Sequence, residues 1–217
     1  MKSEVLRYLG YKNQEISAEL SEKLDFLISD IPKNLTPKMV WEVFEPDFNE
    51  NISLKNTTLE LKGKSIGDHL QNAEKVAVMA VTLGIEAERL ILKYQHLNMV
   101  DALICDAVLD SLVEKAADDC EEKIKDYAKE NNLFTNFRFS PGYGDLPLDT
   151  QKTLIATLNA EKRIGITVTE SNILLPRKSV TAVVGLFKDK PLNKPHSCEN
   201  CNMKDKCNSK KECIKNV

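Results

Sequence analysis

The chain has 217 residues, of which 42% are hydrophobic and 29% are charged, and its formal net charge is -3. This composition is that of a globular protein long enough to bury a core, and it excludes the basic surface of a nucleic-acid-binding protein. The first residues contain no apolar signal core, and no apolar run is long enough to span a bilayer. We therefore expect a cytoplasmic protein with no membrane and no nucleic-acid partner.

The first quarter of the chain predicts one helix followed by two strands. Apolar residues recur at helical spacing up to Ile31, with Ser17 as the expected N-cap and Pro32 as the stop. Residues 38–45 and 52–61 are rich in β-branched and aromatic residues, which favours strands.

The middle of the chain predicts a short helix over 65–72, a buried strand over 76–83, and helices over 85–95 and 98–131. Cys105 and Cys120 fall on the apolar side of the last helix, where they are expected to be small buried hydrophobes. The aspartates of this helix, such as Asp106 and Asp110, are expected on a solvated surface. His69 is expected at the surface or with its hydrogen bonds satisfied.

Residues 136–150 read NFRFSPGYGDLPLDT and predict a strand, a tight turn and the start of a helix. The alternation around Arg138 places its side chain opposite the two flanking phenylalanines, and Pro141 ends the strand. Gly142 and Gly144 leave the backbone bare on both sides of Tyr143. The arginine could bind a carboxylate and the tyrosine could stack on a flat ring. The alternative is a simple connection with a surface arginine.

The last part of the core predicts a helix over 150–162, capped by Asp149, and strands over 166–175 and 179–187. Strands, long helices and then strands again, with no regular βαβ alternation, indicate an α+β fold with a mixed or antiparallel sheet. The common dinucleotide and P-loop fingerprints are missing from the sequence. We expect residues 1–187 to form the domain and 188–217 to form a cysteine-rich tail.

The tail contains Cys198, Cys201, Cys207 and Cys213 with spacings of two, five and five residues. Four thiolates suit tetrahedral zinc or an iron–sulfur cluster. Free thiols or adventitious disulfides are the alternatives, and the spacing leaves the metal's identity open.

The run Arg138-Phe-Ser-Pro-Gly-Tyr143 resembles the Arg-x-x-Pro-Gly-Tyr motif of the activation domain of cobalamin-dependent methionine synthase. The likeness continues through Thr169-Glu-Ser171 to the strand Ser179–Gly185. The chain up to about Phe187 looks like a free-standing version of that domain. The resemblance implies a helmet-shaped α+β fold around a twisted, mainly antiparallel sheet, with S-adenosylmethionine bound in an extended pose.

The resemblance also implies which residues bind the ligand. Arg138 would hold the methionine carboxylate, and main-chain groups at Val180 and Thr181 would lie beside the ligand. The full-length enzymes often carry two aromatic residues at those two strand positions, and their acidic residue for the ligand's ammonium has no match here. The turn expected around the adenosine comprises Pro141, Gly142, Tyr143, Gly144 and Asp145.

The implied function is the rescue of oxidised cob(II)alamin, which needs one electron and a methyl group from S-adenosylmethionine. The protein's task would be to align the sulfonium carbon with the cobalt rather than to act as an acid or base, so no catalytic residue is assigned. The partner would be the cobalamin-binding domain of a separate methionine synthase, and a cluster on the tail or an electron-donor protein would supply the electron. Because the cobalt belongs to that partner, whether this chain alone is an enzyme stays open.

Two other functions fit the same residues. The chain could be an iron–sulfur redox activator of another corrinoid methyltransferase, or a non-catalytic interaction module that keeps the fold.

Overall fold

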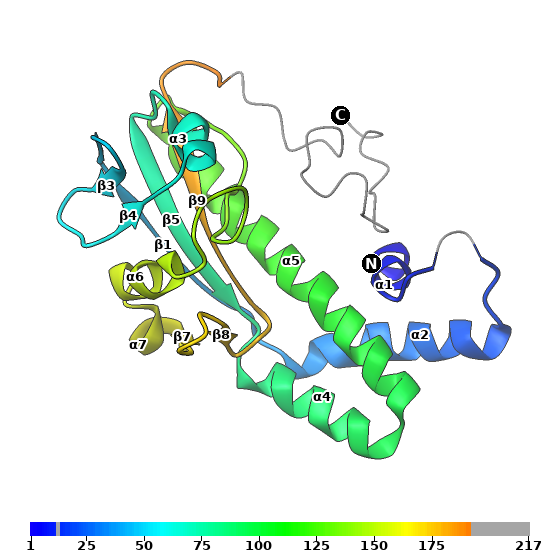
Figure 1. Cartoon of the computed structure of the whole chain (residues 1–217). Coiled ribbons are helices and arrows are strands. Elements are labelled where there is room, and N and C mark those ends of the chain that lie inside the picture. Colours follow the sequence, from blue (N-terminus) through cyan, green and yellow to red (C-terminus); the bar gives the residue numbers. More distant parts are fainter. Residues whose placement is uncertain (12–13, 192–217) are drawn as a thin grey trace.

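The computed structural model describes residues 1–11 and 14–191, and it has one long helix lying across an antiparallel sheet (Figure 1). The main sheet has four strands in the order β1-β5-β9-β6. The helices are α1 (Lys2–Tyr8), α2 (Ala18–Asp30), α3 (Lys64–Leu70), α4 (Ile85–Leu97), α5 (Met99–Glu130), α6 (Thr150–Thr157) and α7 (Ala160–Ile164), with a 3₁₀ turn η1 (Ile31–Asn34). The strands are β1 (Lys38–Phe44), β2 (Pro46–Phe48), β3 (Ile52–Leu54), β4 (Glu60–Leu61), β5 (Lys75–Thr82), β6 (Phe134–Thr135), β7 (Thr167–Val168), β8 (Leu174–Leu175) and β9 (Ser179–Phe187).

The two central strands, β5 and β9, form the middle of the core. They pair antiparallel from Lys75 opposite Leu186 to Thr82 opposite Ser179. Both are continuous apolar runs, because helices cover one face of the sheet and the smaller elements cover the other. This confirms the predicted α+β class with an antiparallel sheet.

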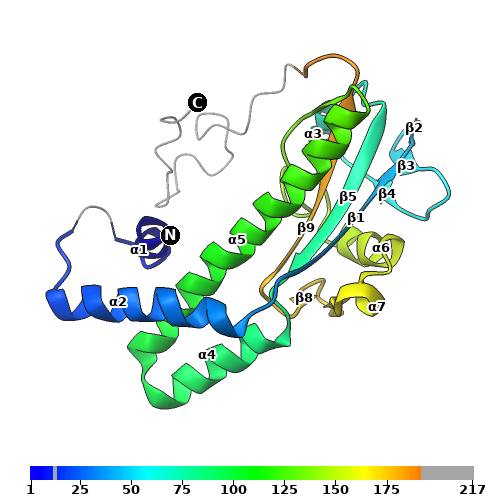
Figure 2. The same cartoon turned by 180° about the vertical axis from the view of Figure 1, so that it is seen from behind.

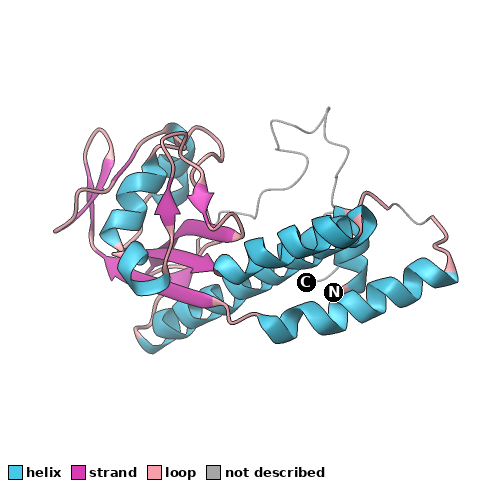
Figure 3. Cartoon of the chain, turned by 90° about the horizontal axis from the view of Figure 1, so that it is seen from below, coloured by secondary structure: helices cyan, strands magenta, loops and turns pink. Residues whose placement is uncertain are grey.

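Helix α5 packs across one face of the sheet and extends beyond it (Figure 2). Its small buried residues, including Ala116, Ala117 and Cys120, lie against the side chains of β5 and β9. Beyond the end of the sheet, α1, α2 and α4 pack on α5 around a second cluster of apolar side chains. Figure 3 shows this division, with the strands gathered at one end of the molecule and helices extending from it.

The opposite face of the sheet is covered by α3, α6, α7 and the two small sheets, β2-β3-β4 and β7-β8. Phe139, Leu154 and Leu158 belong to the core on this side. The two faces therefore have different covers: a single long helix on one and several short elements on the other.

Three predicted elements are interrupted. The strand expected over 52–61 is β3 and β4 joined by a turn, and that over 166–175 is the β7–β8 hairpin. The helix expected over 150–162 divides into α6 and α7 because Asn159 adopts the left-handed conformation. Asparagine tolerates positive φ better than most residues, so turns form at Asn56, Asn159 and Asn172 within these segments.

The predicted caps have different outcomes. The Ser17 hydroxyl accepts a hydrogen bond from the Leu20 amide, as expected for an N-cap. Asp149 was expected to cap α6, but this was wrong: its backbone is helical and its side chain makes no capping bond.

Candidate functional site

The segment 136–139 is held against the edge of β9 by main-chain and amide contacts. The Asn136 side chain donates to the carbonyl of His69 and accepts from the amide of Gly185, both at 2.8 Å. Phe139 exchanges two backbone hydrogen bonds with Val183 at 2.9 Å. Arg138 therefore lies in an extended segment just after β6 rather than inside a regular strand.

Alternation along this segment places Arg138 and its neighbours on opposite faces, as predicted. Phe139 belongs to the core on the α6 side and Phe137 packs against that core. The Arg138 side chain lies on the other face, where it reaches α5. The His69 ring lies against both phenylalanines, and its Nε2 donates to the carbonyl of Phe137. His69 is thus buried with a satisfied nitrogen.

The guanidinium of Arg138 contacts three carboxylates of α5. Its Nη2 lies 2.7 Å from Asp118 and 3.5 Å from Glu114, and its Nε lies 3.1 Å from Glu121. Its Nη1 is buried and makes no hydrogen bond within the described part of the chain. One nitrogen of the guanidinium is therefore unused, and the carboxylates around it outnumber its single positive charge.

A cavity of about 680 Å³ opens beside Arg138, between α1, α5 and the 140–144 turn. Such a volume is typical of a small-molecule site. Burial raises the pKa of Tyr8 in its α1 wall, and the Glu114 carboxylate raises it further. The lining residues include Arg7 and Tyr8 from α1, Glu114 and Asp118 from α5, and Arg138 and Tyr143.

The sequence reasoning missed the contributions of α1 and α5 to this cavity. The acidic residues of α5 had a signal: Asp106, Asp110, Glu114, Asp118 and Glu121 follow one another at three- or four-residue spacing, which places successive members on neighbouring parts of one helix face. Asp106 and Asp110 lie on the partly exposed surface of the helix, with 47% and 34% of their side chains exposed, and both also form ion pairs with the nearly buried Lys178, which the sequence did not predict.

The turn after Pro141 requires its glycines. Gly142 and Gly144 have φ of 90° and 55°, in the left-handed region. A Cβ on Gly144 would lie 2.7 Å from the Ser65 side chain, so the turn packs closely on α3. Tyr143 projects between them with 59% of its surface exposed, and its ring meets Phe139 edge-on. An exposed ring at a cavity rim can stack on a flat ligand.

Asp145 fixes this turn to the start of α3. Its two carboxylate oxygens accept hydrogen bonds from the amides of Lys64 and Ser65 at 2.7 and 2.9 Å. The bonds from the Ser65 and Lys64 amides lower the pKa of Asp145, although burial opposes them. Its carboxylate is thus engaged with the protein's own backbone.

Val180 and Thr181 lie on β9, beyond the last bridge from the 136–139 segment. The Thr181 hydroxyl donates to Gln151 at 2.6 Å and is buried, whereas Val180 packs on the α5 side. Val183 faces the 136–139 segment, so strand alternation turns the main-chain groups of Thr181 toward the same edge. The structure thus brings this strand edge near the turn, without placing either side chain in the cavity lining.

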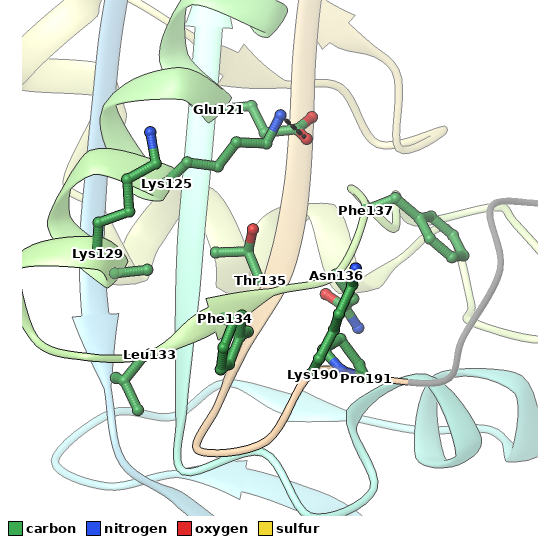
Figure 4. A pocket seen from close by; sticks show the side chains of 11 residues that line it. Glu121, Lys125, Lys129, Leu133, Phe134, Thr135, Asn136, Phe137, Lys190 and Pro191 are labelled. Atoms are coloured by element: carbon green, nitrogen blue, oxygen red, sulfur yellow. Dashed lines mark ion pairs between the residues drawn. The ribbon is translucent and has the colours of Figure 1, made fainter. Parts of the chain in front are cut away.

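A second cavity, of about 420 Å³, lies between the end of α5 and the segment 133–137 (Figure 4). Phe134 and Phe137 line it together with lysines such as Lys125. Glu121 belongs to this lining and also contacts Arg138, so it stands between the two cavities.

Within residues 1–11 and 14–191, no group of three or more His, Cys, Asp or Glu side chains is arranged to hold a metal ion. Cys198, Cys201, Cys207 and Cys213 lie outside the described residues. The helices of the described chain include none that is both long and apolar enough to cross a membrane.

Comparison with known proteins places these features in a family. Residues 53–206 match the family model described as the activation domain of vitamin B12-dependent methionine synthase. The fold is similar to a crystal structure of the MetH reactivation domain bound to AdoHcy, with a TM-score of 0.63 and 19% identity over 86% of this chain and 72% of that one. A search of curated proteins found no significant match.

Proposed function

The chain belongs to the family of activation domains of vitamin B12-dependent methionine synthase, and from this membership we propose that it binds S-adenosylmethionine beside Arg138. In the cytoplasm it would support reductive remethylation of cobalamin carried by a separate methionine synthase. The observation that carries the proposal is the position of the motif's arginine and tyrosine, which line one cavity of suitable size. The structural neighbour of the same fold was crystallised with AdoHcy.

The residues around the cavity suit the two ends of such a ligand. Arg138 would bind the carboxylate of the amino-acid part, since guanidinium–carboxylate pairs are strong and directional. Tyr143 would stack on the adenine, with the bare backbone at Gly142 and Gly144 allowing close approach. The strand edge at Thr181 would lie along the ligand, next to Val180, which stands opposite Val81 of β5, while Pro141 and Asp145 maintain the turn.

The role of the protein in the reaction would be alignment. S-adenosylmethionine supplies the methyl group through its sulfonium, and the corrinoid that accepts it belongs to the partner. Arg138 and the 141–145 turn would hold the two ends of the donor, so that the sulfonium faces the docked partner. Holding a bound donor in one orientation lowers the entropy cost of the transfer.

Isothermal titration calorimetry with S-adenosylhomocysteine tests the ligand. Arg138→Ala should weaken binding roughly 30-fold or more, the loss expected when one partner of a charged hydrogen bond is removed. Arg177→Ala is the matched control, because that arginine is exposed and pairs with Glu88. Equal affinity of Arg138→Ala and the wild type would refute the proposed site, and a protein that binds no ligand would favour an interaction module.

A cobalamin-binding methionine synthase fragment that lacks its own activation domain tests the partner. Mixed with this chain, S-adenosylmethionine and a reductant, its cob(II)alamin spectrum should change to that of methylcobalamin. No change with a protein that binds the ligand would direct attention to a different corrinoid protein.

We also propose that the four tail cysteines bind zinc or an iron–sulfur cluster, which in the latter case could deliver the electron. Anaerobic purification followed by iron, sulfide and zinc analysis tests this. Stoichiometric zinc in a colourless protein would assign the electron to a separate donor protein. A cluster in a protein that binds no S-adenosylmethionine would favour the redox activator.

A further inference from the structure

Two neighbouring carboxylates on α5 contact Arg138 in different ways. Glu121 has 14% of its side chain exposed and lies at the Nε of the guanidinium, whereas Asp118 has 67% exposed and lies at Nη2. Of these two carboxylates on α5, Glu121 is therefore largely shielded from solvent and Asp118 is largely exposed to it.

Glu121 is fixed from both sides. Its second oxygen lies 3.1 Å from the ammonium of Lys125, an ion pair visible in Figure 4. A carboxylate held between Lys125 and Arg138 has little freedom to turn away, and its sheltered position reduces screening by water. Glu121 therefore fixes the direction of the Arg138 side chain.

Asp118 lacks such constraints. Its contact with Arg138 at 2.7 Å is the only ion pair that it makes within the described residues, and most of its side chain faces solvent. Exposed ion pairs contribute little to stability, so the carboxylate can swing away at small cost. Asp118 lines the cavity together with Arg138 and with Glu114, an exposed carboxylate that lies farther from the same Nη2, at 3.5 Å.

We infer that Asp118 occupies the place of the ligand's carboxylate when no ligand is bound, and that Glu121 positions Arg138 to receive it. The inference rests on the proposed function. A ligand carboxylate approaching Nη2 of Arg138 must displace Asp118, which is the carboxylate nearest to that nitrogen, because the carboxylates already around the guanidinium outnumber its single positive charge. Neutralising the two residues should therefore change affinity in opposite directions.

Calorimetry compares two ligands that share the adenosine part. S-adenosylhomocysteine has the amino-acid end, and 5′-methylthioadenosine lacks it. Asp118→Asn should tighten S-adenosylhomocysteine binding by about 2- to 5-fold, the range expected for releasing an exposed ion pair. Glu121→Gln should weaken it by about 10-fold through loss of a sheltered charge partner. Neither variant should change the affinity for 5′-methylthioadenosine, which has no group to reach Arg138.

Glu122→Gln is the matched control for Glu121→Gln. Glu122 also contacts Lys125, at 2.7 Å, but is exposed and makes no ion pair with Arg138 in the described structure. Its variant should bind S-adenosylhomocysteine like the wild type. A Glu121→Gln protein whose affinity for the two ligands falls equally would show a structural role and overturn the positioning role.

Weaker binding of S-adenosylhomocysteine to Asp118→Asn would overturn the role inferred for Asp118, since Asp118 would then contact the ligand's ammonium. These failures differ from failure of the proposed function. If Arg138→Ala abolishes binding while the two carboxylate variants do not diverge, only the present inference is wrong. If Arg138→Ala binds normally, the ligand site itself is wrong.

Discussion

Two of the basic side chains that pair with acidic residues of helix α5 are Lys178 and Arg138, and these two contacts differ in what surrounds them. Toward its start, Asp106 and Asp110 hold Lys178, whose side chain is 10% exposed. Further along, Glu114, Asp118 and Glu121 hold Arg138 at the margin of a cavity.

The difference lies in the surroundings of the cation rather than in its charge. The Nζ of Lys178 also lies 3.4 Å from the backbone carbonyl of Asp106, and the backbone carbonyl of Lys178 accepts a hydrogen bond from the Leu83 amide. Lys178 therefore connects α5 to the adjoining ends of β5 and β9. Arg138 borders the cavity, and its partner Asp118 is exposed. A buried cation with all its contacts inside the protein stabilises the fold, whereas one with a replaceable partner is available to a ligand.

The largest effect is expected from removing Lys178. Lys178→Ala leaves two neighbouring carboxylates without their cation and should lower the free energy of unfolding by roughly 2 kcal/mol, less than the loss of a fully buried pair because both aspartates are partly exposed. Urea unfolding followed by circular dichroism measures this. Lys178→Met keeps the apolar part of the side chain and should lose about half as much. Unchanged stability in both would place Lys178 among ordinary surface charges.

A smaller effect is expected when Arg138 becomes lysine. Arg138→Lys keeps the charge but cannot contact Glu121 and a ligand in the same planar arrangement, so affinity for S-adenosylhomocysteine should fall about 10-fold with little change in stability. Calorimetry and thermal denaturation of the same samples separate the two quantities. A large loss of stability with unchanged affinity would make Arg138 the equivalent of Lys178.

The Asp145 carboxylate stabilises the turn close to the candidate site, and its contribution to the protein's stability should depend on pH. Its pKa is lowered in the folded state, so its contribution is present above the unfolded pKa of about 3.9 and is lost as pH falls through the lower folded value. Asp145→Asn should therefore lower the melting temperature at pH 7, and the difference from the wild type should shrink progressively as the pH falls below about 4. A constant difference across the pH range would mean that the carboxylate's charge is not what stabilises the turn.

The smallest response is expected from the thiols on the buried side of α5. Burial raises the pKa of Cys105 to about 12 and that of Cys120 to about 11, so neither forms the reactive thiolate near neutral pH. Peptide mapping after maleimide treatment should find both unmodified in the native protein and modified in denaturant. Labelling of either in the native protein would contradict the predicted role as a buried hydrophobe.

Local patterns were sufficient for the long elements and for one side of the site. Apolar periodicity predicted α5, and an uninterrupted apolar run predicted β5. Alternation around Arg138 correctly placed its side chain opposite Phe137 and Phe139. These predictions succeeded because each depends on neighbours in the sequence.

The misplaced boundaries have a common cause. The predicted strands and helix that divide do so at asparagines in the left-handed conformation, such as Asn56, Asn159 and Asn172, and asparagine adopts ordinary conformations equally well. Which one it takes depends on packing that the local pattern does not contain.

The sequence by itself determined the family, the antiparallel α+β class and the motif from Arg138 to Tyr143. Only the tertiary structure decided what surrounds Arg138: which carboxylates of α5 it meets, which of them is exposed, and that α1 forms a wall of the cavity. The physical reason is distance along the chain. Asp118 lies 20 residues before Arg138 in the chain, and α1 lies well over a hundred residues before it. Whether these three parts meet therefore depends on how α5 lies across the sheet.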